Sequence, residues 1–196
     1  MLDISAQIDK RRVIFDYVDE HMIAKIHEVS KEIVNCIKSG NKVMTCGNGG
    51  SAANAQHITG DIVGRFKKER RGFAGLSLTV EPSTITAVGN DYDYSVIFSR
   101  QVEGLGKEGD ILIGLSSSGN SPNVVKAVEK AREMGIKTIG LLGNNGGILG
   151  DMMDFTITIP DKASDLCEEF AMTLSHIILE EAEAELVELI QQEVFV

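Results

Sequence analysis

The chain switches repeatedly between the hydrophobic spacing of helices and that of strands. In HMIAKIHEVSKEIVNCIKSGN (21–41), apolar residues recur at positions 22, 23, 26, 29, 33 and 37, which is the spacing of one helix face. Ser39 and Gly40 supply a C-terminal stop, so we predict helix over the first forty residues. The run KVMTC (42–46) then predicts a short strand.

The same alternation continues to the end of the chain. Short apolar runs at 75–79, 110–116, 137–143 and 154–160 predict further strands. Helical spacing occupies 95–105 and 123–135, and one long helix is expected from about Asp165. Strands that alternate with helices favour a parallel sheet with helices on both faces. We therefore predict an α/β fold, doubly wound in three layers like a flavodoxin or Rossmann domain, with extra helices at both ends.

Length and composition narrow the function classes. We predict one domain over 1–196, with N-terminal helices in 1–40, a parallel core in 41–162 and a C-terminal helix in 163–196. The net charge of −10 opposes nucleic acid as the main partner. No apolar run approaches membrane-spanning length, and MLDISAQIDKRR lacks the apolar core of a signal peptide. Cys36, Cys46 and Cys167 show no paired spacing, so neither disulfides nor a cysteine zinc site are expected in this protein, which we predict to be cytoplasmic.

Three loops are expected at the carboxyl edge of the sheet, where such sheets bind ligands. GNGGS (47–51) can form an anion-binding nest at a helix start, or equally a tight turn that binds nothing. SSSGNS (116–121) is more informative, because four hydroxyls precede the helix start at Pro122 and one would suffice for a cap. We interpret it as a phosphate cradle, and GNNGG (143–147) as a turn at the rim.

These stretches together resemble a known family. CGNGGSAANAQH (46–57), VGNDYDYSVIFSRQVEGL (88–105), the serine loop and the acidic C-terminal helix with its histidine are similar to the sugar isomerase (SIS) domain family, and within it to the phosphoheptose isomerases. The resemblance runs roughly from Ile33 to Leu189. It implies a five-stranded parallel SIS fold and a homotetramer with active sites between subunits. It also implies conversion of sedoheptulose 7-phosphate to D-glycero-D-manno-heptose 7-phosphate, an early step toward the surface heptose of lipopolysaccharide or capsule.

The resemblance also implies roles for single residues. His57, Asp61, Glu168 and His176 would hold a divalent metal, with zinc the expected ion, and Asp61 and His176 would be catalytic. The implied substrate-binding residues are Asn48, Gly49, Gly50, Ser51, Asn90, Asp91, Ser116, Ser117, Ser118, Ser121 and Glu168. Two positions depart from the family pattern: Asp61 stands where the family has a glutamate, and Glu168 where it has a glutamine.

The residues themselves suit this chemistry. Aldose–ketose isomerisation needs a base and an acid with separated pKa values, and a carboxylate with a histidine meets that need. His57 and Asp61 are four apart and share a helix face, although most such pairs are only a polar surface. Glu168 and His176 are eight apart, about 12 Å along a helix, so both reach one ion only if the side chains lean together or belong to different subunits.

Other functions remain open at this point. The substrate could be another ketose phosphate, such as a modified heptose or an octose. A non-catalytic scaffold that resembles replication-initiator-associating proteins is a second alternative. A sugar-phosphate-sensing module is a third, although no DNA-binding domain is apparent in the sequence. Retention of a carboxylate at Asp61, together with His176, favours the enzyme.

Overall fold

Five parallel strands form one sheet in the order β2-β1-β3-β4-β5 in the computed structural model, which describes residues 2–193. This is a doubly wound order whose switch point lies between β1 and β3. Every predicted strand is confirmed, with ends that move by two residues at most. The strands are β1 (Val43–Cys46), β2 (Gly75–Ser77), β3 (Ile111–Ser116), β4 (Lys137–Gly143) and β5 (Phe155–Ile159).

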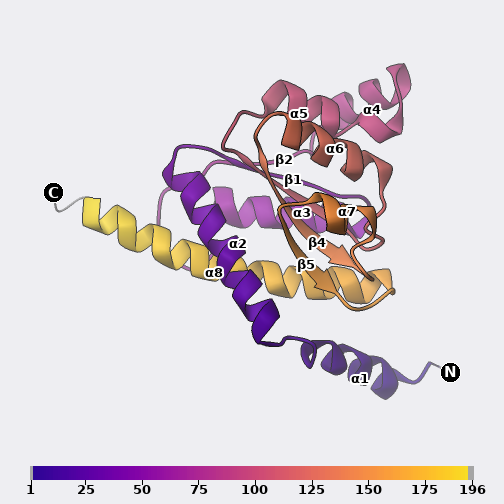
Figure 1. Ribbon diagram of the computed structural model, residues 1–196. Coiled ribbons are helices and arrows are strands. Elements are labelled where there is room, and N and C mark those ends of the chain that lie inside the picture. Colours follow the sequence, from indigo (N-terminus) through magenta and orange to yellow (C-terminus); the bar gives the residue numbers. More distant parts are fainter. Residues whose placement is uncertain (1, 194–196) are drawn as a thin grey trace.

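Helices cover both faces of the sheet, as the alternating pattern predicts. Figure 1 shows α4, α5 and α6 on one side and α2 and α8 on the other. The helices are α1 (Ile4–Phe15), α2 (Glu20–Lys38), α3 (Gly50–Val63), α4 (Pro82–Asp91), α5 (Ser99–Leu105), α6 (Pro122–Glu133), α7 (Gly147–Met152) and α8 (Ser164–Glu193). None of the helices within residues 2–193 has the length and apolar character needed to cross a bilayer.

Local chemistry explains where the helices differ from expectation. The N-terminal helical region is divided because the Asp19 carboxylate accepts from Met22 N and begins α2 afresh. The helix predicted over 95–105 is wrong in its first turn, where Asp93 caps a 3₁₀ turn at Tyr94–Val96. The buried Ile97 and Phe98 then turn the chain into the core before α5 begins. Helices α4 and α7 were not predicted, since both are short and rich in glycine or β-branched residues.

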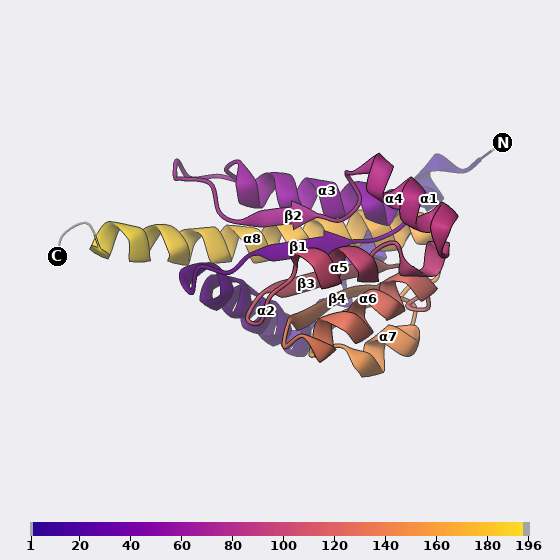
Figure 2. The ribbon, with the colours of Figure 1, turned by 90° about the horizontal axis from the view of Figure 1, so that it is seen from above.

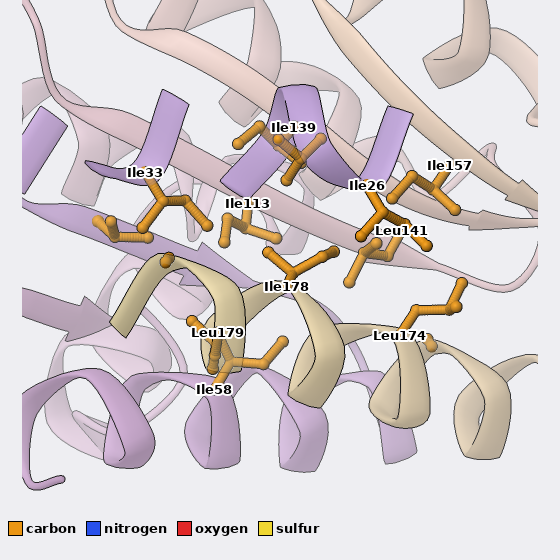
Figure 3. Close-up of a cluster of buried hydrophobic side chains, with 14 of the residues drawn as sticks. Ile26, Ile33, Ile58, Ile113, Ile139, Leu141, Ile157, Leu174, Ile178 and Leu179 are labelled. Carbon is orange, nitrogen blue, oxygen red and sulfur yellow. The ribbon is translucent and has the colours of Figure 1, made fainter. Parts of the chain in front are cut away.

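Two apolar cores enclose the sheet, one on each face. Ile113 and Ile139 point toward α2 and α8, whereas Leu112 and Leu142 of the same two strands point to the other face and pack with α6. Figure 3 shows the first core, where side chains of the strands meet those of α2, α3 and α8. This core fixes α8 against the sheet.

Helices α3 and α8 lie side by side and run in the same direction (Figure 2). Asn54 Nδ2 near the start of α3 donates to the carbonyl oxygen of Glu168 near the start of α8, at 2.8 Å. Further along, His57 on α3 meets His176 on α8. Residues far apart in the sequence are therefore paired along the two helices, and the pairing decides which side chains can act together.

Candidate active site

The serine loop after β3 turns its hydroxyls toward one another. Ser116 Oγ lies 3.1 Å from Ser121 Oγ and 3.4 Å from Ser118 Oγ, and it also accepts from Gly119 N. Ser121 is the N-cap residue of α6 but makes no capping hydrogen bond with its side chain. Its hydroxyl faces the loop instead, so the serines exceed what a helix cap requires and form a polar cradle at a helix N-terminus.

The loop after β4 packs closely against the serine loop and hydrogen-bonds to it. A Cβ on Gly119, whose φ is +67°, would lie 2.0 Å from the carbonyl oxygen of Gly146. Leu149 N donates to Gly119 O, and Ile148 N donates to Asn120 Oδ1. The predicted turn over 143–147 is thus confirmed and leads directly into α7, whose start packs on the serine loop.

The glycine loop after β1 is braced against the serine loop by two asparagines. Asn48 and the buried Asn123 exchange amide hydrogen bonds of 2.8 Å in both directions. Tyr94 Oη also donates to Asn48 Oδ1 at 3.1 Å. Gly49 caps α3 with φ +56°, a conformation that glycine adopts without strain. Asn123 and Tyr94 were not singled out from the sequence, because only the strand order brings them to Asn48.

Asn90 and Asp91 lie at the end of α4, on the opposite face of the sheet from α3. Both are exposed, and Asn90 Nδ2 donates to Asp91 Oδ1 at 2.8 Å. The buried Ser51, in the first turn of α3, lines a small cavity together with Ser117 and Glu168. The two polar loops and α8 therefore converge at the carboxyl edge.

His57, Asp61 and His176 form a compact group between α3 and α8. His57 Nε2 lies 3.3 Å from His176 Nε2, and the two nitrogens are 3.5 and 3.7 Å from Asp61 Oδ2. His57 and Asp61 share a helix face, as their spacing predicts, and the parallel course of α8 adds His176.

These three residues fit a divalent metal ion. Ligands about 2.0–2.1 Å from a tetrahedral zinc are about 3.4 Å apart, close to the three separations in this group. Asp61 Oδ2 is buried and has no hydrogen-bond partner among the described residues, which is costly unless another group satisfies it. Two imidazole nitrogens and one carboxylate oxygen are a donor set that zinc accepts.

Glu168, the fourth predicted metal ligand, does not join this group. Its carboxylate lies against the start of α3, where a Cβ on Gly50 would be only 2.1 Å from Glu168 Oε2. The physical reason is the separation of Glu168 and His176 along α8, about 12 Å on a straight helix. A negative charge at the N-terminus of α3 is electrostatically favourable. The carboxylate thus belongs with the glycine loop of this chain.

The cysteines take no part in the group. All three are buried and free, as their spacing predicts. Burial raises the pKa of Cys46 to about 12, and burial with the nearby Asp110 carboxylate does the same for Cys36. Neither thiol supplies a nucleophile or a metal-binding thiolate near neutral pH.

Fold and polar loops together define a class of protein, the sugar isomerase or SIS domains. The family model described as SIS domain matches residues 8–143. A phosphoheptose isomerase from Fusobacterium nucleatum is 47% identical over 165 residues, covering 84% of this chain and 84% of that protein. One from Akkermansia muciniphila is 46% identical over 165 residues, covering 84% of this chain and 87% of its own.

Solved structures agree with the sequence relatives. The phosphoheptose isomerase from Neisseria gonorrhoeae has a TM-score of 0.87 at 31% identity, with 92% of this chain and 97% of that chain covered. The chain therefore belongs to the phosphoheptose isomerase family of SIS-domain enzymes.

Proposed function

We propose that this isomerase converts sedoheptulose 7-phosphate to D-glycero-D-manno-heptose 7-phosphate. The names of its relatives supply the substrate class. The observation that carries the proposal is the group of His57, Asp61 and His176, which sets a carboxylate and imidazoles within 4.8 Å of one another. A carboxylate beside a histidine is the pair that moving a proton between adjacent carbons requires.

Asp61 and His176 divide the proton transfers. One takes a proton from C1 of the ketose while the other delivers a proton to the carbonyl oxygen at C2, which gives an enediol. Return of a proton to C2 and loss of the O1 proton then give the aldehyde at C1. Because the proton removed from one carbon is replaced on the next, the reaction consumes no oxidant or reductant.

The same group would hold a divalent ion, for which zinc is the expected metal. His57, Asp61 and His176 would be its ligands, and the Asp61 oxygen that has no partner among the described residues supports that assignment. When bound, such an ion polarises a substrate carbonyl. A metal-binding role for Glu168 would need its carboxylate to come from another subunit.

The two polar loops would bind the rest of the substrate. The phosphate fits the serine loop, where neutral hydroxyls and the N-terminus of α6 donate hydrogen bonds. The sugar hydroxyls would meet the glycine loop, the end of α4 and the Glu168 carboxylate. The full set for sugar and phosphate is Asn48, Gly49, Gly50, Ser51, Asn90, Asp91, Ser116, Ser117, Ser118, Ser121 and Glu168.

At the scale of the assembly, we propose one SIS domain over 1–196 that forms a cytoplasmic homotetramer. The support is α1, in which only Ile14 is buried while Ile4, Ile8 and Phe15 are exposed. Figure 1 shows α1 extending from the body of the molecule. A helix with this much exposed apolar surface is typical of a subunit interface.

A second candidate is the same reaction on another ketose phosphate, such as a modified heptose or an octose. Asp61 favours it, because its carboxylate is one methylene shorter than the glutamate of the family pattern and would meet a differently placed substrate. Incubation of the purified protein with sedoheptulose 7-phosphate, followed by NMR, distinguishes the two candidate substrates. Appearance of the aldose signals supports the heptose, and an unchanged spectrum contradicts it. Mass alone cannot report the reaction, since the two sugars are isomers.

A further inference from the structure

The segment between α3 and β2 is held on α8 by one buried ion pair. Arg70 and Glu183, which we call the clamp, lie 2.8 Å apart, and each side chain is only 3% exposed. The Glu183 carboxylate also accepts from the backbone N–H groups of Phe66, Lys67 and Lys68, at 2.7–2.9 Å. A buried carboxylate satisfied by four donors sets the position of this otherwise irregular segment.

The other half of the clamp holds the end of α3. The guanidinium of Arg70 donates to the carbonyl oxygens of Asp61, Ile62 and Gly64, at 2.7–3.1 Å. These are carbonyls of the last turn and the C-cap, and a cation there is favourable. Arg70 thus ties the backbone of Asp61 to the same anchor that holds Phe66.

The ring of Phe66 stacks on the imidazole of His176. The ring centroids are 5.3 Å apart and the planes differ by 16°. The ring of His57 meets the same imidazole edge-on, with centroids 5.1 Å apart and planes at 62°. Two rings therefore contact His176, one across its face and one at an angle.

Among the described residues, no carboxylate or carbonyl oxygen is hydrogen-bonded to the imidazole of His176. A catalytic or metal-bound imidazole ordinarily donates its second nitrogen to a carboxylate or carbonyl, which fixes its plane. Within residues 2–193, the protein group hydrogen-bonded to His176 is His57, and it meets Nε2 rather than Nδ1. The Phe66 ring, stacked on the face of the imidazole, restricts rotation of that ring out of its plane.

We propose that Phe66, held by the Arg70–Glu183 clamp, is a positioning residue that keeps the His176 ring aimed at Asp61 and His57. The inference rests on the role proposed above for His176. It explains why a buried ion pair stands beside the site, since the clamp fixes the Asp61 backbone and the Phe66 ring together. The same ion pair then positions both members of the candidate acid–base pair, the Asp61 carboxylate and the His176 imidazole.

The test compares Phe66→Leu with Phe66→Tyr. Leucine retains apolar packing but removes the aromatic face, whereas tyrosine keeps it. For Phe66→Leu we expect kcat to fall about 10–100-fold with KM little changed, and the zinc dissociation constant, measured with zinc alone against a competing chelator, to rise by a similar factor. Phe66→Tyr should keep both kcat and the zinc dissociation constant close to those of the natural protein. Phe66→Met provides a second apolar variant in case the leucine variant does not fold.

Phe155→Leu is the matched control, because Phe155 is also partly buried against the same core but lies on β5. It should lower thermal stability and leave kcat and zinc affinity unchanged. Equal losses of kcat and zinc affinity in Phe155→Leu and Phe66→Leu, or no loss in Phe66→Leu, would overturn the inference.

His176→Ala distinguishes failure of the proposed role of His176 from failure of the positioning role of Phe66. If it is as active as the natural protein, the proposed role of His176 fails and the inference falls with it. If it is inactive while Phe66→Leu is unimpaired, only the positioning role is wrong.

Discussion

The Asp61 carboxylate differs from an ordinary surface carboxylate in its burial and in its neighbours. One of its oxygens is buried without a hydrogen-bond partner among the described residues, and it faces two imidazole nitrogens at 3.5 and 3.7 Å. The position of this carboxylate is set by α3, so a change of one methylene moves the oxygen by roughly 1 Å. Such a displacement can cost about 10²-fold in rate.

We therefore expect Asp61→Glu to lower kcat on sedoheptulose 7-phosphate by about 10²-fold, because the longer side chain misplaces the carboxylate. Elemental analysis of protein purified without chelator should find zinc in the natural protein. A glutamate variant that turns over this sugar much faster than the natural protein would show that the heptose is not the substrate for which the site is built. Absence of any divalent metal would refute the metal assignment.

We expect Ser116 and Ser118 to affect substrate affinity rather than the rate of the chemical step, because they are proposed to contact the phosphate and not the reacting carbons. Ser116→Ala and Ser118→Ala should each raise KM with kcat little changed. A hydrogen bond to a charged group contributes about 1.5–3 kcal/mol, so KM should rise at least tenfold. Ser30→Ala is a control, since it removes a buried hydroxyl that donates to Ile26 O on α2. An unchanged KM in both loop variants would remove the serine loop from the phosphate site.

At the scale of elements, the parallel pairing of α3 and α8 determines which residues meet at the candidate site and which ion pair stabilises it. The pairing brings Glu168 to the start of α3, His176 to its third turn and Glu183 to the segment that follows it. Burial opposes ionisation of Glu183, but hydrogen bonds from Phe66, Lys67 and Lys68 N–H groups and from Arg70 prevail, and its pKa lies below the ordinary value of 4.5.

A carboxylate with a lowered pKa stabilises the folded state above its ordinary pKa, and this stability is lost as the pH falls through the folded value. Glu183→Gln leaves Arg70 buried without its partner, so we expect it to destabilise the protein by about 3–5 kcal/mol at neutral pH. The difference from the natural protein should shrink as the pH falls below 4.5. Thermal unfolding at a series of pH values measures it, with the exposed Glu188→Gln as control. A difference that is constant across pH would contradict the ionised pair.

At the scale of the whole molecule, the rest of the described chain leaves most of α1 uncovered, since Ile14 is the one buried residue of this helix. It contacts the rest of the chain through Ile14 in the first core, through Arg11, which pairs with Asp165 and Glu169, and through Phe15 against Phe170. These contacts join α1 to the start of α8 but leave Ile4 and Ile8 exposed. We propose that a second copy of the chain covers this apolar surface.

For the proposed tetramer, light scattering should give a mass of about four times the 21.2 kDa of one chain. Ile8→Glu places a charge on the apolar surface of α1 and should shift the assembly toward smaller species, because burial of an unpaired charge is costly. Lys10→Glu, on the same helix at an exposed polar position, should not. A mass of one chain for the natural protein would refute the tetramer.

The sequence by itself determined the order and type of the strands, the two polar loops and the shared face of His57 and Asp61. These depend on contacts between near neighbours, namely hydrophobic spacing, glycine and serine at loop positions, and the four-residue helix repeat. It also determined the family, through several short motifs in one order.

Only the tertiary structure decided which distant groups meet. Neighbouring spacing says nothing of how α8 lies on α3, so Glu168 was predicted beside the histidines and lies instead at Gly50. Asn123 reaches Asn48 because β3 is next to β1 in the sheet. The clamp joins residues 113 positions apart, and neither Arg70 nor Glu183 carries a local signal. Such pairs are fixed by the packing of whole elements, which no local pattern records.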